Sequence, residues 1–309
     1  MKRLFTLFLA LLLVFGCAVC VTAADADLSD TGKNIVTIGD WVMEKIDKGT
    51  HWEMDEYVGP GGEVVVPWQV SDIMVVSLGD HCFANNTNVT SVVTTSPPWR
   101  IGEYCFIDCM TLEKIELNNM IDTIGVGAFS GTSSLKDINL QDSIVTEIKP
   151  YTFLNSAIEE VALPKTCTTL GAYSFGQCTQ LSKVTIPKSV TTIHEDAFKG
   201  SNNVVIYCYS NSAAHHFAEA KGIDYVLLDA YTFILGDADG DGEVTVSDVT
   251  VLQRVLAGMT DDPDGMIALR GTITGDKLDI THVTMIQRHL ANLEYDSDVP
   301  IGTQVTRYL

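Results

Sequence analysis

Apolar residues recur at a regular interval through the middle of the chain. Phenylalanine occupies positions 83, 106, 129, 153, 175 and 198, at intervals of 22 to 24 residues. Each phenylalanine ends a variant of one short motif, such as Ile101–Phe106 or Leu170–Phe175, and an alternating segment such as Leu112–Leu117 follows it. One turn of this length cannot bury its own apolar side chains, whereas stacked turns bury them in continuous columns. The pattern predicts a solenoid over residues 64–230, with a parallel β ladder and a buried phenylalanine column.

The alternating segments also predict which side chains face the core, because successive side chains of a strand point to opposite faces. Two buried columns are expected, namely Ile115, Ile138, Val161 and Val184, and Leu117, Leu140, Leu163 and Ile186. The polar positions beside them form an extended surface that either binds a ligand or keeps the protein soluble. These positions are Glu113, Lys114, Glu116, Lys136, Asp137, Asn139, Glu159, Glu160, Ala162, Ser182, Lys183 and Thr185.

Both ends of the repeat region carry segments that differ from the repeat and predict caps. Residues Asp40–Ile46 and His51–Tyr57 alternate on either side of a short polar turn, which predicts a β-hairpin within an N-terminal β cap over residues 24–63. At the other end, Ser212–Ala220 predicts a short helix that ends at Gly222, and Tyr225–Leu228 predicts a strand. The solenoid should therefore be closed at both ends.

The residues that make up the repeat motif are more specific for a family than the interval at which the motif recurs. The turns follow an I-G-x-x-A-F motif and then an L-x-x-I-x-L-P motif, as in Ile124–Phe129 and Leu181–Pro187. This combination resembles the leucine-rich repeats of bacterial BspA-type surface proteins, over about Val64 to Leu228. The resemblance implies a leucine-rich-repeat fold and a role in binding.

A second pattern follows the repeats. Residues 237–248 place carboxylates at positions 1, 3, 5 and 12 of a twelve-residue loop, with Gly242 at position 6. This arrangement matches the oxygen cage of an EF-hand calcium site, in which Gly permits the sharp turn. The expected ligands are Asp237, Asp239, Asp241, Asp248 and the backbone carbonyl of Glu243. The alternative is an acidic turn in an acidic protein.

The loop and the helix after it are duplicated. Residues 244–258 align with residues 278–292 at an offset of 34, with Gln-Arg at equivalent positions. A duplicated calcium loop and helix resembles the dockerin domain, which implies an all-α module over residues 233–293 that binds a cohesin domain, followed by a tail over 294–309. The resemblance assigns the cohesin contacts to Val246, Ser247, Gln253, Arg254, Ile280, Thr281, Gln287 and Arg288. Alternatively, the two arginines are simply solvated.

The second loop departs from the calcium pattern. Position 1 is Thr272, position 12 is His282, and one glycine of the pattern is absent. The remaining oxygen donors are Thr274, Asp276 and Asp279. Because calcium affinity follows the charge and geometry of the ligands, we expect one strong Ca²⁺ site and a second site that is weak or absent.

The first 23 residues predict an export signal. Lys2 and Arg3 precede an apolar run from Leu4 to Phe15, and Val21–Ala23 provides a cleavage site of small residues. A membrane anchor or lipid attachment at Cys17 are the alternatives. No other segment is apolar enough to span a membrane. The sequence therefore predicts a secreted protein.

The net charge of −21 argues against nucleic acid or an anionic membrane as a partner. Six cysteines lie beyond the export signal: Cys82, Cys105, Cys109, Cys167, Cys178 and Cys208. An exported protein with an even number of cysteines suggests disulfides. However, these residues share repeat positions with Ala, Ser and Thr, which favours burial as small apolar side chains.

Taken together, the patterns predict an α+β multidomain protein, in which a leucine-rich-repeat solenoid with a β-hairpin cap precedes a small EF-hand-like dockerin. No catalytic motif accompanies them. The predicted function is that of a non-catalytic secreted component of a cellulosome-type complex in plant polysaccharide catabolism. Its dockerin would bind a scaffold cohesin, and its repeats would bind a protein or a glycan. The alternatives are a surface adhesin and a polysaccharide-acting hydrolase.

Overall fold

The computed structural model describes residues 35–95, 99–263, 265–274, 277–294, 297 and 299–308. The chain divides into two compact units, with the boundary between Leu227 and Leu228. The predicted export signal over residues 1–23, including Cys17, lies outside the described residues. Among the described residues, no helix combines the length and the apolar composition that crossing a membrane requires.

The predicted hairpin caps the first unit. Strand β2 (Trp41–Ile46) pairs antiparallel with β3 (His51–Tyr57) across the 3₁₀ turn η1 (Asp47–Gly49), and β1 (Ile35–Ile38) adds a further antiparallel strand that the sequence did not predict. The hairpin joins the solenoid because β3 pairs in parallel with β6 (Ile73–Leu78), which β5 (Gln69–Val70) also flanks. Trp41 of this cap packs edge-on against Phe83, at 5.6 Å between ring centroids.

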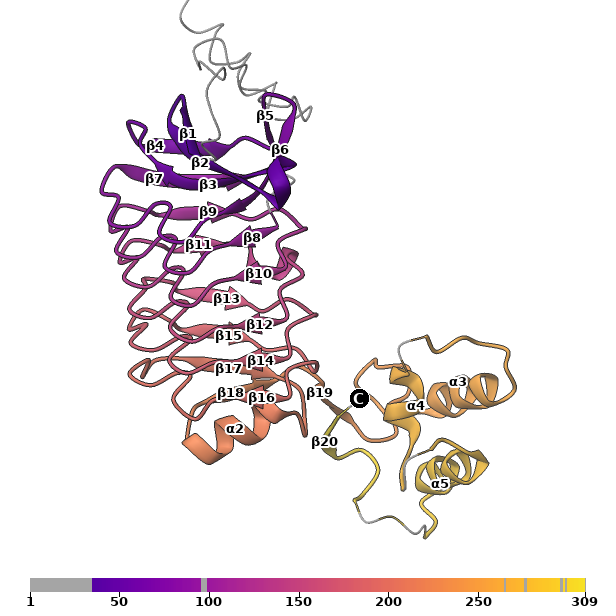
Figure 1. The fold of residues 1–309 in the computed structure, drawn as a ribbon. Helices are drawn as coiled ribbons and strands as arrows, with labels where there is room; N and C mark the ends of the chain where they lie inside the picture. The colour runs from indigo at the N-terminus through magenta and orange to yellow at the C-terminus, as the bar shows by residue number, and fades with distance from the viewer. Residues whose placement is uncertain are drawn as a thin grey trace, which may run out of the picture. The chain divides into compact units, whose positions relative to one another are not determined.

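Two parallel ladders run along the solenoid (Figure 1), where the sequence predicted one. The predicted ladder consists of β4 (Gly62–Val66), β7 (Val89–Thr94), β9 (Lys114–Glu116), β11 (Asp137–Ile138), β13 (Glu160–Ala162), β15 (Lys183–Thr185) and β17 (Val205–Cys208). The unpredicted ladder consists of β6, β8 (Arg100–Ile101), β10 (Thr123–Ile124), β12 (Glu147–Ile148), β14 (Thr169–Leu170) and β16 (Thr192–Ile193). After β6 its strands are only two residues long, too short to show an alternating pattern.

Both ladders break at the same turn. Strands β11 and β13 belong to different sheets, as do β10 and β12. This is the turn in which the interval between phenylalanines, Phe129 to Phe153, is 24 residues. The 3₁₀ turn η2 (Leu140–Asp142) lies here, and the Asn139 side chain bonds both the N–H and the carbonyl of Leu117. The side-chain amide thus satisfies backbone groups next to the interrupted ladder.

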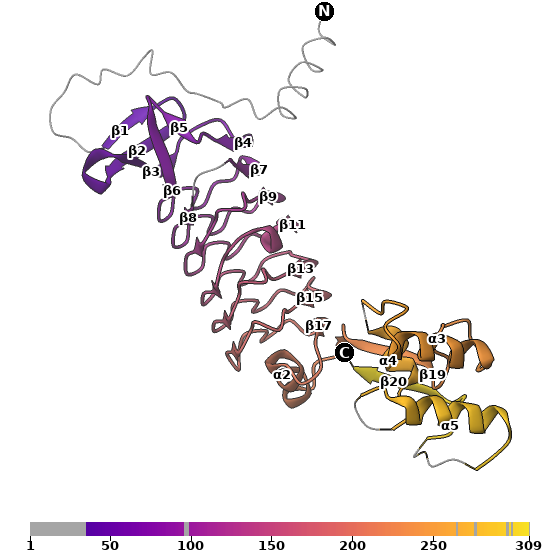
Figure 2. The ribbon, with the colours of Figure 1, turned by 90° about the vertical axis from the view of Figure 1, so that its right-hand side faces the viewer.

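The phenylalanine column is confirmed. The rings of Phe83, Phe106, Phe129, Phe153, Phe175 and Phe198 stack with successive centroids 4.8 to 5.5 Å apart, and each ring is buried. Both predicted aliphatic columns are buried too. The column passes through the turn that interrupts the ladders, where Phe129 stacks on Phe153 and its N–H donates to the Thr152 carbonyl at 2.8 Å. Figure 2 shows that the turns remain stacked through this part of the solenoid.

The cysteines pack as the repeat positions predicted. All six described cysteines are buried, and none of them forms a disulfide with another described cysteine. Burial raises the pKa of the Cys82 thiol well above its ordinary value and that of Cys109 to about 12. Such thiols stay protonated at neutral pH, and the Cys109 thiol donates a hydrogen bond to the Phe83 carbonyl. The cysteines therefore act as small core side chains.

The C-terminal cap of the solenoid also agrees with the sequence. Helix α2 (Ala213–Lys221) begins after Ser212, whose hydroxyl accepts a hydrogen bond from the His215 N–H, and it ends at Gly222, with φ of 65°. A left-handed residue at this position is the usual preference of glycine. Strand β18 (Tyr225–Leu227) then pairs in parallel with β17. The solenoid therefore ends with helix α2 and strand β18.

The second unit is not all-α, which corrects the sequence prediction. It contains helices α3 (Val246–Leu256), α4 (Met266–Gly271) and α5 (Ile280–Leu290) and two antiparallel strands, β19 (Ala230–Ile234) and β20 (Gln304–Tyr308). The predicted tail over residues 294–309 therefore includes a strand. It also supplies Ile301, which is buried in a cluster with Phe233, Leu235 and Leu252. Apolar burial at Ile301 and strand pairing join the two ends of the unit.

Candidate ligand face and metal loop

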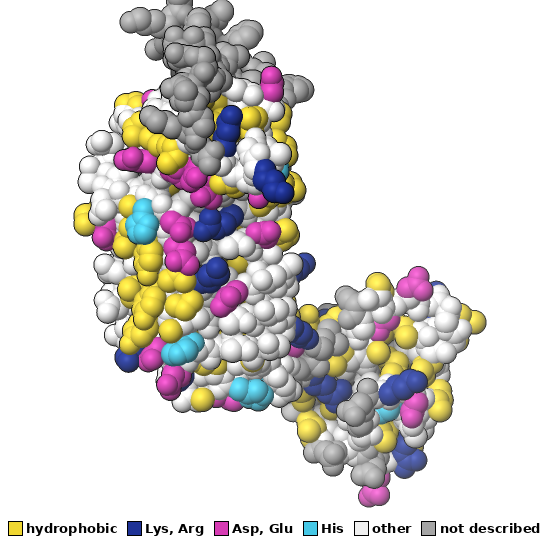
Figure 3. All heavy atoms as spheres, viewed as in Figure 1, with side chains coloured by type: hydrophobic (Ala, Val, Ile, Leu, Met, Phe, Trp, Pro, Cys, Tyr) yellow, Lys and Arg dark blue, Asp and Glu magenta, His cyan; other side chains and the backbone are white. Residues whose placement is uncertain are grey.

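The strand face of the solenoid presents the polar positions that the sequence predicted. All twelve residues of that set are exposed or half-buried, while Ile115, Val161 and Val184 between them are buried. Side chains of opposite charge alternate from turn to turn. Basic and acidic side chains are interspersed over the side of the solenoid seen in Figure 3 and form no large patch of a single sign there.

Ion pairs connect neighbouring turns of this face. The Lys114 ammonium lies 2.5 Å from a carboxylate oxygen of Glu116 and 3.8 Å from one of Asp137 in the next turn. Lys136 bonds Glu159 at 2.8 Å, and Lys183 approaches Glu160 to 3.3 Å. The pairs are solvent-exposed and contribute little to stability. They leave donors and acceptors at the surface, where a partner can bond them.

Two hollows lie on the strand face, one before the ladder break and one across it. The first has a volume of about 290 Å³ and is lined by residues that include Lys114, Asp137 and Asn139. The second, of about 130 Å³, is lined by residues that include Gln141 and Lys183. Both contain charged and amide groups above a floor of buried aliphatic residues. This combination suits side chains of a partner protein or hydroxyl groups of a glycan.

The predicted calcium loop folds around its first carboxylate. The Gly240 and Gly242 N–H groups donate to the two oxygens of Asp237, at 2.7 and 3.0 Å. Both glycines have positive φ, of 81° and 94°. A β-carbon at position 240 would lie 2.0 Å from Nη1 of Arg270, a residue that the sequence analysis did not associate with the loop. The loop conformation therefore requires glycine at this position.

Helix α3 begins at the end of the loop and presents its final carboxylate. Thr245 caps the helix: its hydroxyl accepts the Ser247 N–H at 3.1 Å, and its own N–H donates to Asp248 at 2.7 Å. The Ser247 hydroxyl, which the sequence predicts to contact cohesin, donates to Asp239 at 2.7 Å. Capping thus holds Asp248 over the loop.

Three of the predicted ligands come together. One carboxylate oxygen each from Asp237, Asp239 and Asp248 lies within 4.8 Å of the others, and Asp237 and Asp248 are buried. Oxygens that share a Ca²⁺ ion at about 2.3–2.6 Å lie no more than about 5 Å apart. Within the described residues, no lysine or arginine forms an ion pair with the three. The donor set therefore fits a divalent cation.

Two other predicted ligands lie apart from this cluster. Asp241 and Glu243 are exposed, and a carboxylate oxygen of Asp241 accepts the Glu243 N–H at 2.9 Å. Asp241 would have to rotate to join the cluster. The carbonyl of Glu243 remains a predicted ligand.

The second loop uses hydrogen bonds where the first presents carboxylates. His282, buried at 4% exposure, accepts the Asp279 N–H at Nδ1 (3.0 Å), and its Nε2 lies 2.6 Å from the Thr274 carbonyl. Nδ1 of the ring also lies 3.1 Å from a carboxylate oxygen of Asp279, so both ring nitrogens are engaged within the loop. The Thr281 hydroxyl and N–H bond Asp279 and hold the pKa of that carboxyl below its ordinary value. Asp276 lies outside the described residues. Thr274 and Asp279 are thus already engaged.

The residues assigned to the cohesin contact are all exposed on α3 and α5. Exposed apolar side chains accompany them in pairs at the 34-residue offset: Val246 with Ile280, Leu256 with Leu290, and Met259 with Leu293. The two arginines differ. Arg288 donates from Nε to the Glu294 carbonyl at 2.5 Å, whereas Arg254 has no side-chain bond within the described part of the unit. Arg254 is therefore free to bond a partner.

The repeats match a known family. Residues 76–205 match, in six copies, the family described as BspA type leucine rich repeat region. This segment consists of leucine-rich repeats of the BspA type, which confirms the prediction from the motif. The match ends before the second unit. No curated protein matches the chain.

Solved structures resemble part of the chain. A leucine rich cell surface protein from Faecalibacterium prausnitzii A2-165 is 24% identical with a TM-score of 0.48, and the match covers 58% of this chain and 55% of that protein. For a leucine-rich repeat protein from Bacteroides ovatus ATCC 8483 the values are 25%, 0.48, 56% and 46%. A leucine rich repeat protein of T. pallidum is 22% identical with a TM-score of 0.41, covering 54% of this chain and 68% of its own. The chain spans about half the length of the first two.

Proposed function

We propose that this is an exported, non-catalytic binding protein with two separate attachment functions. The strand face of the repeats binds a partner, preferably a protein, and the second unit binds a cohesin domain in a calcium-dependent manner. The first function is supported mainly by the two polar hollows along the strand face, because solenoids commonly bind partners through extended faces of this kind. A glycan is the other ligand class that these hollows suit.

Dockerin-like behaviour of the second unit rests on three features. The carboxylates of Asp237, Asp239 and Asp248 converge. The helices α3 and α5 repeat at a fixed offset and contact each other. Exposed apolar residues recur at equivalent positions of both helices. Solvent-exposed Val, Ile, Leu and Met at matching positions favour a docking face, because exposing them to water brings no stability to the unit itself.

Calcium would supply the charge that holds the loop together. Asp237, Asp239 and Asp248 would hold the ion, and Asp248 would transmit this order to the first turn of α3, because it accepts the N–H of the capping residue Thr245. Ordering the start of α3 in turn positions Val246 and Arg254 for a partner. The cellulosomal role and the adhesin role differ in what the second unit binds, so a cohesin-binding assay separates them.

Reversing the charge of Lys114 is expected to weaken ligand binding at the strand face at least tenfold. Lys114→Glu places a third carboxylate beside Glu116 and Asp137, and like charges at a binding surface disfavour association strongly. The protein and its variant are screened against polysaccharides and extracellular proteins. The half-buried Lys149, which follows β12 on the other ladder, provides the control Lys149→Glu. Equal effects of the two substitutions would place the ligand elsewhere.

Cohesin binding is expected to depend on one helix more than on the other. Arg254→Ala should weaken cohesin affinity at least tenfold, because a free arginine is a frequent anchor of protein interfaces. Arg288→Ala should change it by less than about threefold, since this side chain already bonds Glu294. Calorimetry of each variant against a panel of cohesins measures both effects. Equal losses, or no loss from Arg254→Ala, would refute a binding mode led by α3.

A further inference from the structure

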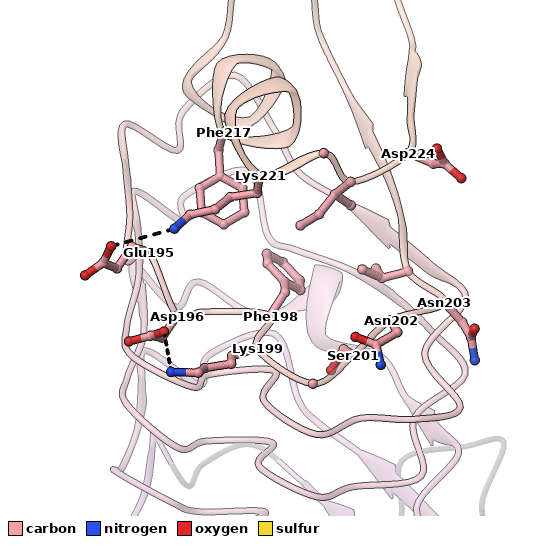
Figure 4. Close-up of a pocket in the computed structure, with 14 residues that line it drawn as sticks. Glu195, Asp196, Phe198, Lys199, Ser201, Asn202, Asn203, Phe217, Lys221 and Asp224 are labelled. Atoms are coloured by element: carbon pink, nitrogen blue, oxygen red, sulfur yellow. Dashed lines mark ion pairs between the residues drawn. The ribbon is translucent and has the colours of Figure 1, made fainter.

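A cavity of about 650 Å³ lies at the C-terminal end of the solenoid, between the last repeat turn and α2 (Figure 4). Phe198, Lys199 and Ser201–Asn203 of the last turn form one side of it. Phe217 and Lys221 of α2, together with Ile223 and Asp224, form the other. Neither the repeat motif nor the calcium loop accounts for this cavity, and it is separate from the strand face.

The cavity lies where the repeat ends. The last turn still presents the backbone N–H donors of the repeat, but no further turn supplies carbonyls to accept from them. In the preceding turn, the N–H groups of Phe175 and Gln177 each donate at 2.9 Å to carbonyls of the next turn, Ala197 and Lys199. The equivalent donors of the last turn are Phe198 and Gly200. The chain continues through β17 into α2 and provides no equivalent carbonyls. In the described residues, neither N–H donates a hydrogen bond.

These two N–H groups open into the cavity, because the equivalent groups of each earlier turn point along the solenoid toward the next one. Phe198 and Gly200 both line the cavity, and Phe198 is only 5% exposed. A backbone donor in such a place requires an acceptor from water or from a ligand. A ligand with oxygen acceptors would therefore meet preformed donors.

The aromatic column also ends at this cavity. Rings within the column lie within 16° of parallel, whereas Phe217 is tilted by 52° against Phe198, with centroids 5.9 Å apart. The tilt leaves Phe217 half-buried at the cavity wall. Together with Phe198, Val204 and Ile223 it gives the site an apolar surface beside its polar groups.

The charges of the site are already balanced in pairs. Lys199 lies 3.0 Å from Asp196, and Lys221 lies 3.7 Å from Glu195 (Figure 4). A third acid, Asp224, lines the opposite part with the amides of Asn202 and Asn203. An anionic ligand would meet three carboxylates, and a cationic one would meet two ammonium groups and unpaired N–H donors. A neutral ligand avoids both kinds of repulsion.

We propose that the cavity binds a short neutral oligosaccharide. Hydroxyl oxygens would accept from the N–H groups of Phe198 and Gly200, and hydroxyl protons would be donated to Asp224 and to the Asn202 carbonyl. The C–H face of a sugar ring would lie against Phe217. The volume of the cavity falls within the range of about 300–1,000 Å³ usual for small-molecule sites.

The test is calorimetric titration of the full chain with neutral trisaccharides: cellotriose, xylotriose, mannotriose and maltotriose. Trigalacturonate, the glucosamine trimer and a blocked tetra-alanine peptide serve as charged and peptide comparisons. At least one neutral trisaccharide should bind with a Kd on the order of 1 mM or tighter. Binding of none of them, or a preference for a charged sugar or for the peptide, would overturn the proposal.

Two variants locate the site. Ile223→Trp places a larger side chain in the cavity and should weaken binding at least tenfold. Asn202→Ala removes an exposed amide and should weaken it about fivefold, as expected for one hydrogen bond. Gln304→Ala removes an exposed amide from β20 and should leave affinity unchanged. Circular dichroism and melting temperature verify the fold. Unchanged affinity in folded Ile223→Trp and Asn202→Ala would show that the sugar binds elsewhere and refute the assignment.

Discussion

Removing calcium is expected to lower the melting temperature of the second unit by about 10–20 °C and to leave the transition of the repeats unchanged. A ligand at 100 times its Kd stabilises the state that binds it by about 2.7 kcal/mol. For a unit of this size, each kcal/mol corresponds to roughly 4–8 °C. The effect is large because the buried carboxylates of Asp237 and Asp248 lie close together with no basic side chain paired to them in the described residues.

Scanning calorimetry with Ca²⁺ and with a chelator measures this difference, and titration measures the number of sites. One strong site is expected, and Asp239→Ala should abolish it. Asp261→Ala provides the control, because Asp261 is an exposed acid of the same unit outside the loop. Two equally tight sites would contradict the assignment of His282 and Asp279 to hydrogen bonds within the second loop.

Truncation of a central ring in the phenylalanine column is expected to destabilise the solenoid by about 3–5 kcal/mol. Phe129 is fully buried and stacks at 5.3 Å on both Phe106 and Phe153. Phe129→Ala therefore removes two ring contacts and leaves a cavity that the stacked turns cannot close. The position also adjoins the turn where both ladders break, so that fewer strand hydrogen bonds hold neighbouring turns together there.

Denaturant unfolding of Phe129→Ala measures this loss. Met110→Ala is the matched control: Met110 is 57% exposed, so its truncation should change the free energy of unfolding by less than about 0.5 kcal/mol. Phe129→Leu should have an intermediate effect, because it retains much of the apolar volume. A loss below about 1 kcal/mol in Phe129→Ala would contradict a continuous column.

Local patterns were sufficient for much of this molecule. The interval between phenylalanines predicted a column whose rings do stack, and the repeat positions shared by Cys82, Cys105 and Ala128 predicted small buried side chains. Ser212 and Gly222 marked the ends of α2. The spacing of Asp237, Asp239 and Asp248 placed their carboxylates together. In each case the residues that interact lie at a fixed separation along the chain, so their spacing in the sequence predicts which side chains come together.

Contacts without such a period were decided by the tertiary structure. Strands β19 and β20 pair although about seventy residues separate them, and nothing local in residues 304–308 specifies that partner. The turn with one additional residue interrupts both ladders, but only the packed core determines where that residue is accommodated. The cavity beside α2 arises because the repeat pattern of backbone donors continues to Phe198 and Gly200 while the acceptors end. The sequence by itself thus determined which side chains are buried together, and the folded chain decided which backbone groups find partners, because that depends on segments brought together from a distance.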